Sequence, residues 1–451
     1  MNAHLASRED AHRASKEELA RAFAETRAGT LRLFDLVSEE AELHQSPGGG
    51  FRPVIWHLAH IGVFEAYWLL QKLKGESAPD ERYERIFDPI RTPREESKDL
   101  PSRREMEDYL TRVRERVMSY LDDACFDSPD PLLRDGYLFQ LVLEHERQHQ
   151  ETLAYLLHML DPSKKSRAPS ESDVNAANLP VANAARVVVP GMVSVAEGVC
   201  RIGAVWNSFA YDNEYPAHEV YVPAFKIDRL PTTNAEYARF ISEGGYERRE
   251  WWSAEGWAWR EREGWTCPLY WRGGEGEVWS AQTMFAEGAL EPDHPVAGVS
   301  WYEAEAYTRF AGKRLPTETE WEKAASWDAD AGRKRRFAWG DEEPAPALCN
   351  SGSRFWGTTP AGSFPSGASF YGCLDMTGNV WEWTGDAFEG YKGFEPFPYP
   401  EYSATWFDGD HRVLKGGSWA THASILRTSF RNFFRRHFRI AFAGFRCASD
   451  D

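Results

Sequence analysis

Two histidines that could share a metal ion stand four residues apart in the segment LVLEHERQHQETL, residues 141–153. Within a helix, positions i and i+4 lie on one face about one turn apart, so the imidazoles of His145 and His149 can reach the same ion. Histidines at this spacing are more often solvated or hydrogen-bonded than metal-bound, so a metal site requires a further ligand from elsewhere in the chain.

The segment PVIWHLAHIGVFEAYW, residues 53–68, supplies two candidates for that ligand, His57 and His60. Helical bundles build metal sites from inward-facing side chains of different helices, so one of these two could join His145 and His149. The other is expected to be a hydrogen-bonded core residue. Three neutral imidazoles leave three positions of an octahedral iron(II) ion open for substrate and dioxygen. Zinc with an activated water is the alternative, and the number of ligands does not separate the two metals.

The elements that must position these histidines are long helices. Apolar residues at three- and four-residue spacing predict helices over residues 8–44, 53–75, 102–124 and 132–161. Ser102 and Glu105 have the spacing of a capping box, and Pro53 suits the first turn of a helix. Four helices of this length are typical of a bundle.

Beyond about residue 161 the sequence changes character. A stretch rich in Ser, Pro, Ala and Asn comes first, and short β-type runs with many Gly, Pro and Trp follow it. We therefore expect a multi-domain chain, α then α+β. The expected parts are a four-helix bundle over residues 1–161, a linker over 162–188 and an irregular α+β domain over 189–451.

Charge and cysteine content exclude several classes of function. The chain has 52 basic and 70 acidic residues, and its net charge of -18 repels nucleic acids and anionic membranes. No apolar run has the length of a signal peptide core or a membrane span, which predicts a cytoplasmic protein. The six cysteines form no CxxC pair, so we expect reduced thiols instead of a disulfide framework.

Motifs in both parts of the chain resemble known families. HERQHQE and WHLAHIGVFE are similar to the histidine motifs of the DinB-like helical domain of ergothioneine-type sulfoxide synthases, which implies His60, His145 and His149 as the metal ligands. RLPTETEWEKAA, GNVWEWT, LKGGSW and FAGFRCA occur in the order found in the formylglycine-generating-enzyme (sulfatase-modifying-factor, C-type-lectin-like) fold, over roughly residues 189–449.

One departure bears on the reaction. Formylglycine-generating enzymes keep two copper-binding cysteines after the GGS motif, whereas this chain has Thr421 and Leu426 there. The resemblance therefore implies a nonheme iron(II) oxidoreductase that uses O2. It would join a thiol sulfur to the imidazole ring of hercynine, a trimethylated histidine, and give the sulfoxide of ergothioneine biosynthesis. A calcium ion in the second domain is a further implication, with no ligands assigned.

The resemblance also implies substrate residues. Gln148 and Asn432 match positions that contact substrate in the family, and Phe433 follows Asn432. Branches that use γ-glutamylcysteine have an acidic residue and an arginine where this chain has Phe434 and Phe438, which favours L-cysteine as the sulfur donor.

Phe64 stands where some hercynine-using relatives have Gln. Plain histidine, as in ovothiol synthesis, and a selenosugar donor, as in selenoneine synthesis, therefore remain alternatives.

The family's proton-donating tyrosine varies in position, and Tyr391 and Tyr402 are the leading candidates, with Tyr399 and Tyr83 behind them. Arg91 and Arg94, in an arginine-rich loop before the third helix, could hold a substrate carboxylate through paired N–H donors. Two rival functions are a zinc-dependent thiol transferase and a non-enzymatic module that binds a small ligand in an aromatic pocket.

Overall fold

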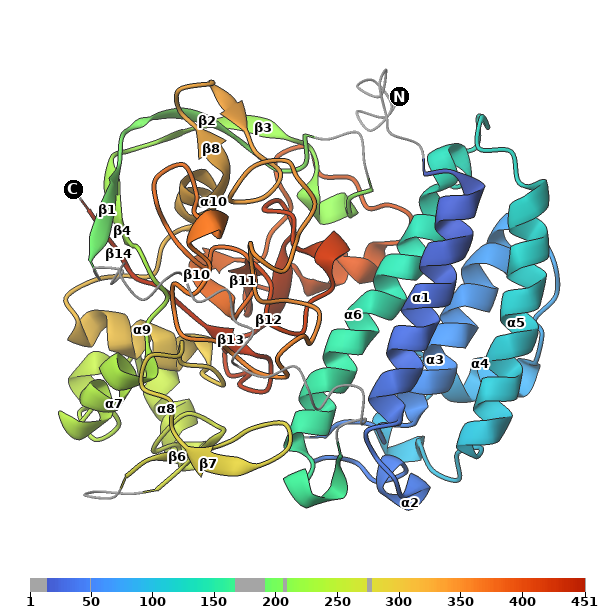
Figure 1. Cartoon of the computed structure of the whole chain (residues 1–451), viewed down its shortest axis with the longest axis horizontal. Helices are drawn as coiled ribbons and strands as arrows, with labels where there is room; N and C mark the ends of the chain where they lie inside the picture. The colour runs from blue at the N-terminus through green and yellow to red at the C-terminus, as the bar shows by residue number, and fades with distance from the viewer. Residues whose placement is uncertain (1–13, 49, 167–190, 206–208, 274–277, 451) are drawn as a thin grey trace. The chain divides into compact units, whose positions relative to one another are not determined.

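The computed structural model describes residues 14–48, 50–166, 191–205, 209–273 and 278–450. The chain divides into two compact units, the first mainly residues 9–172 and the second mainly residues 173–451. The first is helical and the second mixes helices with short strands, which confirms the expected fold class (Figure 1). The expected boundaries around a linker over 162–188 stay a prediction, since residues 167–188 lie outside the described residues.

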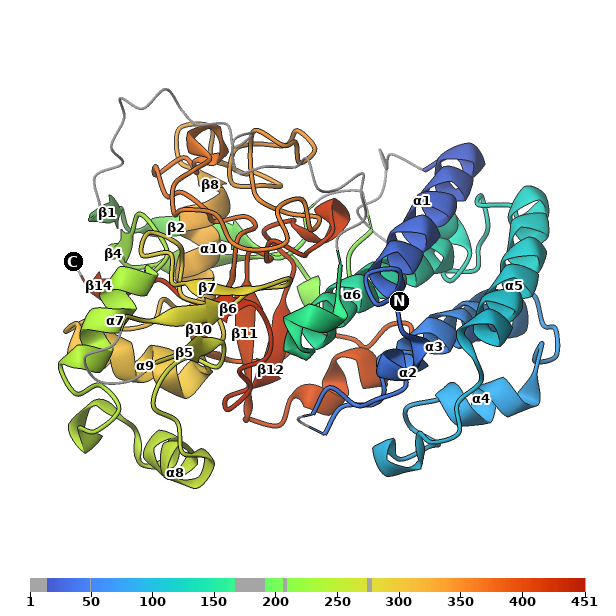
Figure 2. The same cartoon turned by 60° about the horizontal axis from the view of Figure 1, so that its bottom comes forward.

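The first unit is a bundle of four long helices. Each long helix packs against two others, in the cyclic order α1, α6, α3, α5, which Figure 1 and Figure 2 show from two sides. Two short helices, α2 and α4, lie in the connections. The bounds are α1 Lys16–Phe34, α2 Glu40–Leu43, α3 Trp56–Glu65, α4 Glu81–Phe87, α5 Arg103–Asp123 and α6 Tyr137–Met159.

Local sequence explains where the helices begin. The expected capping box is confirmed at α5: the Ser102 side chain accepts from the backbone N–H of Glu105, whose carboxylate accepts from the backbone N–H of Ser102. Helix α6, which carries the histidine pair, follows Gly136 directly. Gly136 has φ +72°, a left-handed conformation that costs glycine little.

Three of the expected helix limits are wrong. The fourth helix begins at Tyr137 and not at residue 132, because Asp135 and Gly136 have positive φ angles that an α-helix does not allow. The first helix does not run to residue 44, because the chain leaves α1 after Phe34 to bury Leu36 and Val37, and Val37 forms a bridge with Lys165. Its expected start at residue 8 lies outside the described residues. The second helix begins at Trp56, whose backbone N–H donates to the carbonyl of Pro53, and it continues as a π-helix over Ala66–Leu73. The loop before α5 contains α4, which the sequence did not predict.

The second unit is built on short sheets. Its four-stranded sheet has the order β12-β11-β10-β13, and all neighbours are antiparallel except the parallel pair β10 and β13. These strands are β10 Trp381–Ala387, β11 His411–Lys415, β12 Asn432–Arg435 and β13 Ala443–Gly444. A three-stranded sheet, β1-β4-β14, is formed by Met192–Val195, Phe225–Asp228 and Ala448–Asp450.

The remaining strands and helices are short. Three smaller sheets are formed by β2 Gly198–Ile202 with β3 His218–Val222, by β5 Trp271–Arg272 with β6 Ser280–Gln282 and β7 Glu287–Ala289, and by β8 Trp327–Asp328 with β9 Arg333–Lys334. The helices are α7 Asn234–Ser242, α8 Ala254–Glu263, α9 Trp301–Phe310 and α10 Glu318–Ser326.

Tryptophans fill the core of the second unit. Trp321, Trp381, Trp383 and Trp419 are among its largest fully buried side chains, as expected for rings that pack a domain with little regular structure. The indole N–H of Trp321 donates to Glu382, which also holds Arg446 through two hydrogen bonds of 2.7 Å. All six cysteines are unpaired. Within the described ranges, no helix is both long and apolar enough to cross a membrane.

Candidate metal centre

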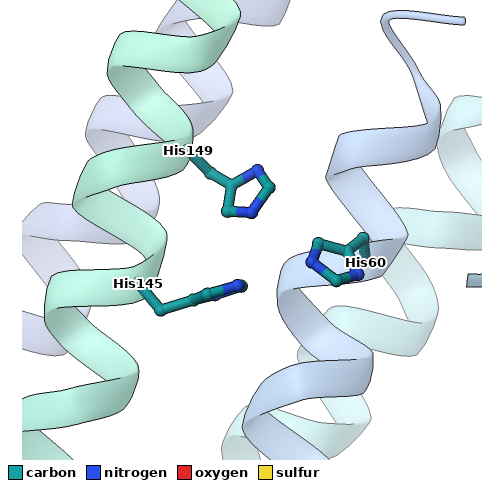
Figure 3. Close-up of side chains that lie close together, drawn as sticks. All are labelled: His60, His145 and His149. Carbon is teal, nitrogen blue, oxygen red and sulfur yellow. The ribbon is translucent and has the colours of Figure 1, made fainter. Parts of the chain in front are cut away.

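Three histidines from two helices converge inside the bundle. His60 projects from α3, and His145 and His149 project from α6, with their rings directed at one another (Figure 3). One candidate ligand atom of each lies within 4.8 Å of those of the other two, and among the described residues this is the group of His, Cys, Asp or Glu side chains that could hold an ion. The spacing leaves room for a metal at the centre of the three rings.

The ring of His60 is fixed by two contacts. It stacks on the indole of Trp56, with centroids 4.5 Å apart, and its Nδ1 lies 2.8 Å from the backbone carbonyl of Phe87. A carbonyl can only accept, so the proton of a neutral His60 sits on Nδ1 and the lone pair sits on Nε2. This is the arrangement that orients an imidazole toward a metal.

The other two rings are supported from α3 in different ways. His149 Nδ1 lies 3.0 Å from His57 Nδ1, whereas the ring of His145 stacks on Phe64 with centroids 3.6 Å apart. His145 Nδ1 is buried, and no group of the described residues forms a hydrogen bond with it. A buried imidazole nitrogen without a partner is costly unless a ligand satisfies it.

Burial keeps these rings neutral. It lowers the pKa of His60 to about 4 and that of His57 to about 3, and it lowers the pKa of His145 and of His149 well below the usual value of 6.5. A metal binds the neutral form of imidazole, so at pH 7 no proton competes with the ion. The donor set therefore fits a divalent transition metal.

A buried group of four charges ties together the helices that carry the histidines. Arg27, Glu65, Arg114 and Glu146, one from each long helix or its end, form what we call the ionic clasp. Arg27 contacts Glu146 at 2.8 Å and Glu65 at 2.9 Å, and Arg114 contacts the same two carboxylates at 3.4 and 2.7 Å. The carboxylate side chains are 1–3% exposed, so the clasp fixes α3 against α6.

Comparison with known proteins covers both units. Residues 22–153 match the DinB superfamily, and residues 177–451 match the sulfatase-modifying factor enzyme 1-like domain. Hercynine oxygenases from Mycolicibacterium smegmatis and Mycobacterium tuberculosis are 39% and 40% identical to the chain, over 96% and 95% of it and 98% and 97% of their own lengths. A formylglycine-generating enzyme from Thermomonospora curvata is 32% identical over 58% of the chain and 94% of its own length.

The extent of these matches decides the family, because the likeness to the hercynine oxygenases runs through the helical unit that holds the three histidines as well as through the second unit. The chain belongs to the hercynine oxygenase family. It is therefore an enzyme, and the non-enzymatic binding module is excluded. The expected pairing of a DinB-like bundle with a formylglycine-generating-enzyme-like domain is confirmed.

The other residues expected to bind substrate in the bundle of this hercynine oxygenase homologue lie in different settings. Gln148 is half-buried on α6, between the two histidines in sequence. Arg91 and Arg94 are exposed: Arg91 pairs with Asp88 at 3.2 Å, and Arg94 donates to the carbonyl of Gly50. Their contact with substrate stays a prediction.

Sequence reasoning missed a buried arginine in the same region. Arg52 donates to the backbone carbonyls of Thr92 and Pro93 at 2.6 and 3.3 Å, and its guanidinium lies 4.5 Å from the centroid of the Trp56 ring. Arg52 therefore holds the loop after α4 against the start of α3. Its position just before Pro53 gave no signal of that role.

In the second unit of the hercynine oxygenase homologue, Tyr391 belongs to a buried ion pair. Its hydroxyl donates to Glu318 at 2.9 Å, and Arg431 donates to both oxygens of that carboxylate at 2.7 and 3.0 Å. Burial and the Glu318 charge raise the pKa of Tyr391 far above its usual range. The hydroxyl of Tyr391 is thus held by a structural partner.

Tyr402, the other tyrosine candidate, lies among aromatic rings. It stacks on Tyr211 with centroids 4.1 Å apart and meets Phe433 edge-on at 6.4 Å, and Phe433 stacks on Phe388 at 4.0 Å. Asn432 begins β12 beside Phe433, and its side-chain oxygen accepts from the backbone N–H of Phe433. Of the residues expected in this unit, the structure therefore brings together Tyr402, Asn432 and Phe433.

Tyr83, a lesser candidate, is buried against Tyr109 in the bundle, with ring centroids 4.3 Å apart.

Proposed function

We propose that the protein is an iron(II)-dependent sulfoxide synthase that forms a C–S bond between the imidazole ring of hercynine and the sulfur of L-cysteine, in ergothioneine biosynthesis. The observation that carries the metal part is the convergence of three imidazoles, those of the buried His60 and the half-buried His145 and His149, on a common point. The substrate part is supported by the name of the whole-length relatives, hercynine oxygenases.

The proposed reaction balances with O2 as the oxidant. The imidazole C–H and the thiol S–H bonds break, a C–S bond forms, one oxygen atom joins the sulfur and the other leaves as water. Iron(II) held by His60, His145 and His149 would supply Lewis acidity toward the thiol sulfur and open positions for O2. Three neutral ligands would leave the positive charge of the ion uncompensated, which would favour a thiolate over a thiol.

The roles of the remaining residues are part of the same proposal. Gln148 contacts the histidine-derived substrate, Asn432 and Phe433 are substrate-binding residues of the second unit, and Arg91 or Arg94 holds a substrate carboxylate. Tyr402 donates a proton to the developing product, since the hydroxyl of the other candidate, Tyr391, already donates to Glu318. Tyr391 is the alternative donor. The second-unit residues rest on resemblance, with the Tyr402–Phe433 contact as support.

The choice of L-cysteine has one observation in its favour. Phe434 and Phe438, which stand where γ-glutamylcysteine-using branches have charged residues, stack on each other with centroids 4.5 Å apart. A stacked apolar pair offers no charge to a γ-glutamyl group. γ-Glutamylcysteine, plain histidine in place of hercynine and a selenosugar donor are the alternative substrates.

The metal is iron in this proposal, and zinc is the alternative. A zinc-dependent thiol transferase would need no O2, which sets it apart from the oxygenases of this family. Calcium in the second unit stays a prediction, since the three-donor group found among the described residues is the histidine group of the bundle. The cytoplasmic location also stays a prediction.

The test is a coupling assay with the apoprotein loaded anaerobically with either Fe(II) or Zn(II). Hercynine or histidine is then offered with cysteine, γ-glutamylcysteine or a selenosugar, while an oxygen electrode and mass spectrometry follow the reaction. We expect the Fe(II)-loaded protein to consume one O2 for each hercynine–cysteine sulfoxide that it forms, and the Zn(II)-loaded protein to form none. Product formed with Zn(II), or without O2, would contradict the proposal.

A further inference from the structure

A fourth histidine stands directly behind the three that converge. His57 lies on α3, three residues before His60, and its Nδ1 is 3.0 Å from Nδ1 of His149. The two rings are tilted by 47° with centroids 5.2 Å apart, so the contact is made through the nitrogens and not through stacked faces. His57 is 8% exposed, which leaves little water to replace this partner.

Two imidazole nitrogens at this distance share one proton. If both carried a hydrogen, two N–H groups would face each other, so one Nδ1 donates and the other accepts. A metal at the centre of the three rings needs a lone pair from His149, and the nitrogen that remains for it is Nε2. The proton of His149 then sits on Nδ1, and His57 Nδ1 is the acceptor.

We propose that His57 is a positioning residue that accepts a hydrogen bond from His149 Nδ1 and so fixes the tautomer and ring angle in which His149 presents Nε2 to the metal. His60 has the equivalent acceptor in the carbonyl of Phe87, 2.8 Å from its own Nδ1. Two of the three rings are thus held by a hydrogen bond that the Nδ1–H donates, one to a backbone carbonyl and one to a side chain.

Because the proposal rests on the metal centre of the proposed function, its test must separate the two. His57→Leu removes the acceptor and keeps an apolar side chain of similar reach. His57→Asn restores an acceptor, since Asn Oδ1 lies the same number of bonds from the backbone as His Nδ1. His158→Leu is the matched control: His158 is a buried histidine of α6 outside the converging group.

The experiment is an anaerobic titration of each full-length apoprotein with Co(II), followed by the visible absorption of the ion. We expect His57→Leu to weaken the Co(II) dissociation constant by roughly 10–100-fold, the range typical of groups that orient metal ligands. His57→Asn and His158→Leu should bind close to the wild-type value. Equal binding by His57→Leu and wild type, or equal weakness of the Leu and Asn variants, would overturn the role of His57.

A measurement on the wild type keeps the test independent of whether a variant folds. In the Zn(II)-loaded protein, ¹⁵N NMR of labelled histidines should find a protonated Nδ1 on His149 and an unprotonated Nδ1 on His57. The reverse assignment would overturn the proposal. A folded wild type that binds neither Co(II) nor Zn(II) would instead overturn the metal centre, and His57 would then have no ligand to position.

Discussion

The ring of Phe64 lies flat on the ring of His145, with centroids 3.6 Å apart and planes 6° from parallel. His145 is the member of the converging group whose Nδ1 has no hydrogen-bond partner among the described residues, and the stack on Phe64 is the closest of its ring contacts. Glu65, the next residue, belongs to the ionic clasp. One turn of α3 therefore both orients a histidine and ties the bundle.

Replacing Phe64 by Leu should loosen His145 without removing a charge. We expect the affinity for Co(II) to fall by roughly tenfold, the low end of the range for groups that orient metal ligands. Tyr67→Leu is the control, because Tyr67 is an exposed aromatic residue of the following π-helical turn. The measurement is a Co(II) titration, and an affinity equal to that of wild type would contradict this role for Phe64.

Metal binding should stabilise the bundle. An ion that binds the folded state alone, at a hundredfold excess over its dissociation constant, adds about 2.7 kcal/mol to the free energy of unfolding. Thermal denaturation of wild type with and without Fe(II) or Zn(II) checks this. His149→Ala should abolish the shift, while His44→Ala, on α2's C-terminal side and away from the group, should retain it. A shift that survives in His149→Ala would place the ion elsewhere.

The ionic clasp should fail when one charge is removed. Arg27→Met leaves Glu65 and Glu146 short of a partner in the interior, and breaking a buried pair in this way costs about 3–5 kcal/mol. Arg103→Met removes a partly exposed arginine paired with Asp35 and Glu107 and should cost about 0–1 kcal/mol. Hydrogen exchange of the α6 amides in the full-length protein measures both, and similar losses in the two variants would contradict a special role for the clasp.

The two tyrosine candidates should give different phenotypes. Tyr402→Phe removes the proposed proton donor and should lower kcat by about 100-fold or more, the usual contribution of a positioned acid, with KM little changed. Tyr391→Phe removes a hydrogen bond to Glu318 and should lower stability by about 1 kcal/mol. Steady-state kinetics with thermal denaturation separates them. A loss of kcat in Tyr391→Phe alone would reverse the assignment.

The second unit should lose stability in acid through Glu322. Burial by itself raises the pKa of Glu322, but the charges of Lys334 and Lys415 outweigh it and lower the pKa from its usual 4.5 to about 2. The unfolded chain therefore binds the proton more readily, and the stabilisation present above pH 4.5 is lost as the pH falls toward 2. The stabilisation lost is on the order of a few kcal/mol, at roughly 1.4 kcal/mol for each pKa unit.

Urea unfolding at pH 5, 4 and 3 measures this loss through tryptophan fluorescence, since most of the 19 Trp lie in the second unit. The control is the double variant Glu322→Gln, Lys334→Met, which leaves the net charge of the buried group formed by Glu322, Lys334 and Lys415 unchanged. Its stability should vary less with pH over this range. Parallel pH profiles in the two proteins would assign the acid sensitivity to other carboxyl groups.

Helical periodicity predicted much of the bundle, including the face shared by His145 and His149 and the capping box of α5. It could not choose between His57 and His60, because residues three apart lie on nearly the same side of a helix. Which of the two histidines can bind a metal depends on partners distant in sequence. The carbonyl of Phe87 accepts a hydrogen bond from His60, and His57 contacts His149 through its Nδ1. The sequence did contain one signal of the buried clasp: Glu65 is the single acidic residue in an otherwise apolar run.

The second unit was predictable as a class but not in detail. Its strands are two to seven residues long, too short for alternation of polar and apolar residues to define them. The contact between Tyr391 and Glu318 joins residues 73 apart in the sequence, and Tyr402 meets Tyr211 across a still longer separation. Such pairs are set by how loops pack around the buried tryptophans, which no local pattern encodes.

The composition of the ionic clasp limits how this bundle can change over generations. Two positive and two negative side chains cancel, and each contacts both members of the opposite sign. A single replacement leaves one uncompensated charge in the interior of the bundle, whereas replacing one arginine and one glutamate together by apolar residues restores neutrality. Related sequences should therefore lose or gain these four residues as pairs of one arginine and one glutamate. A sequence that has lost only one of them would need another ion to compensate the remaining charge.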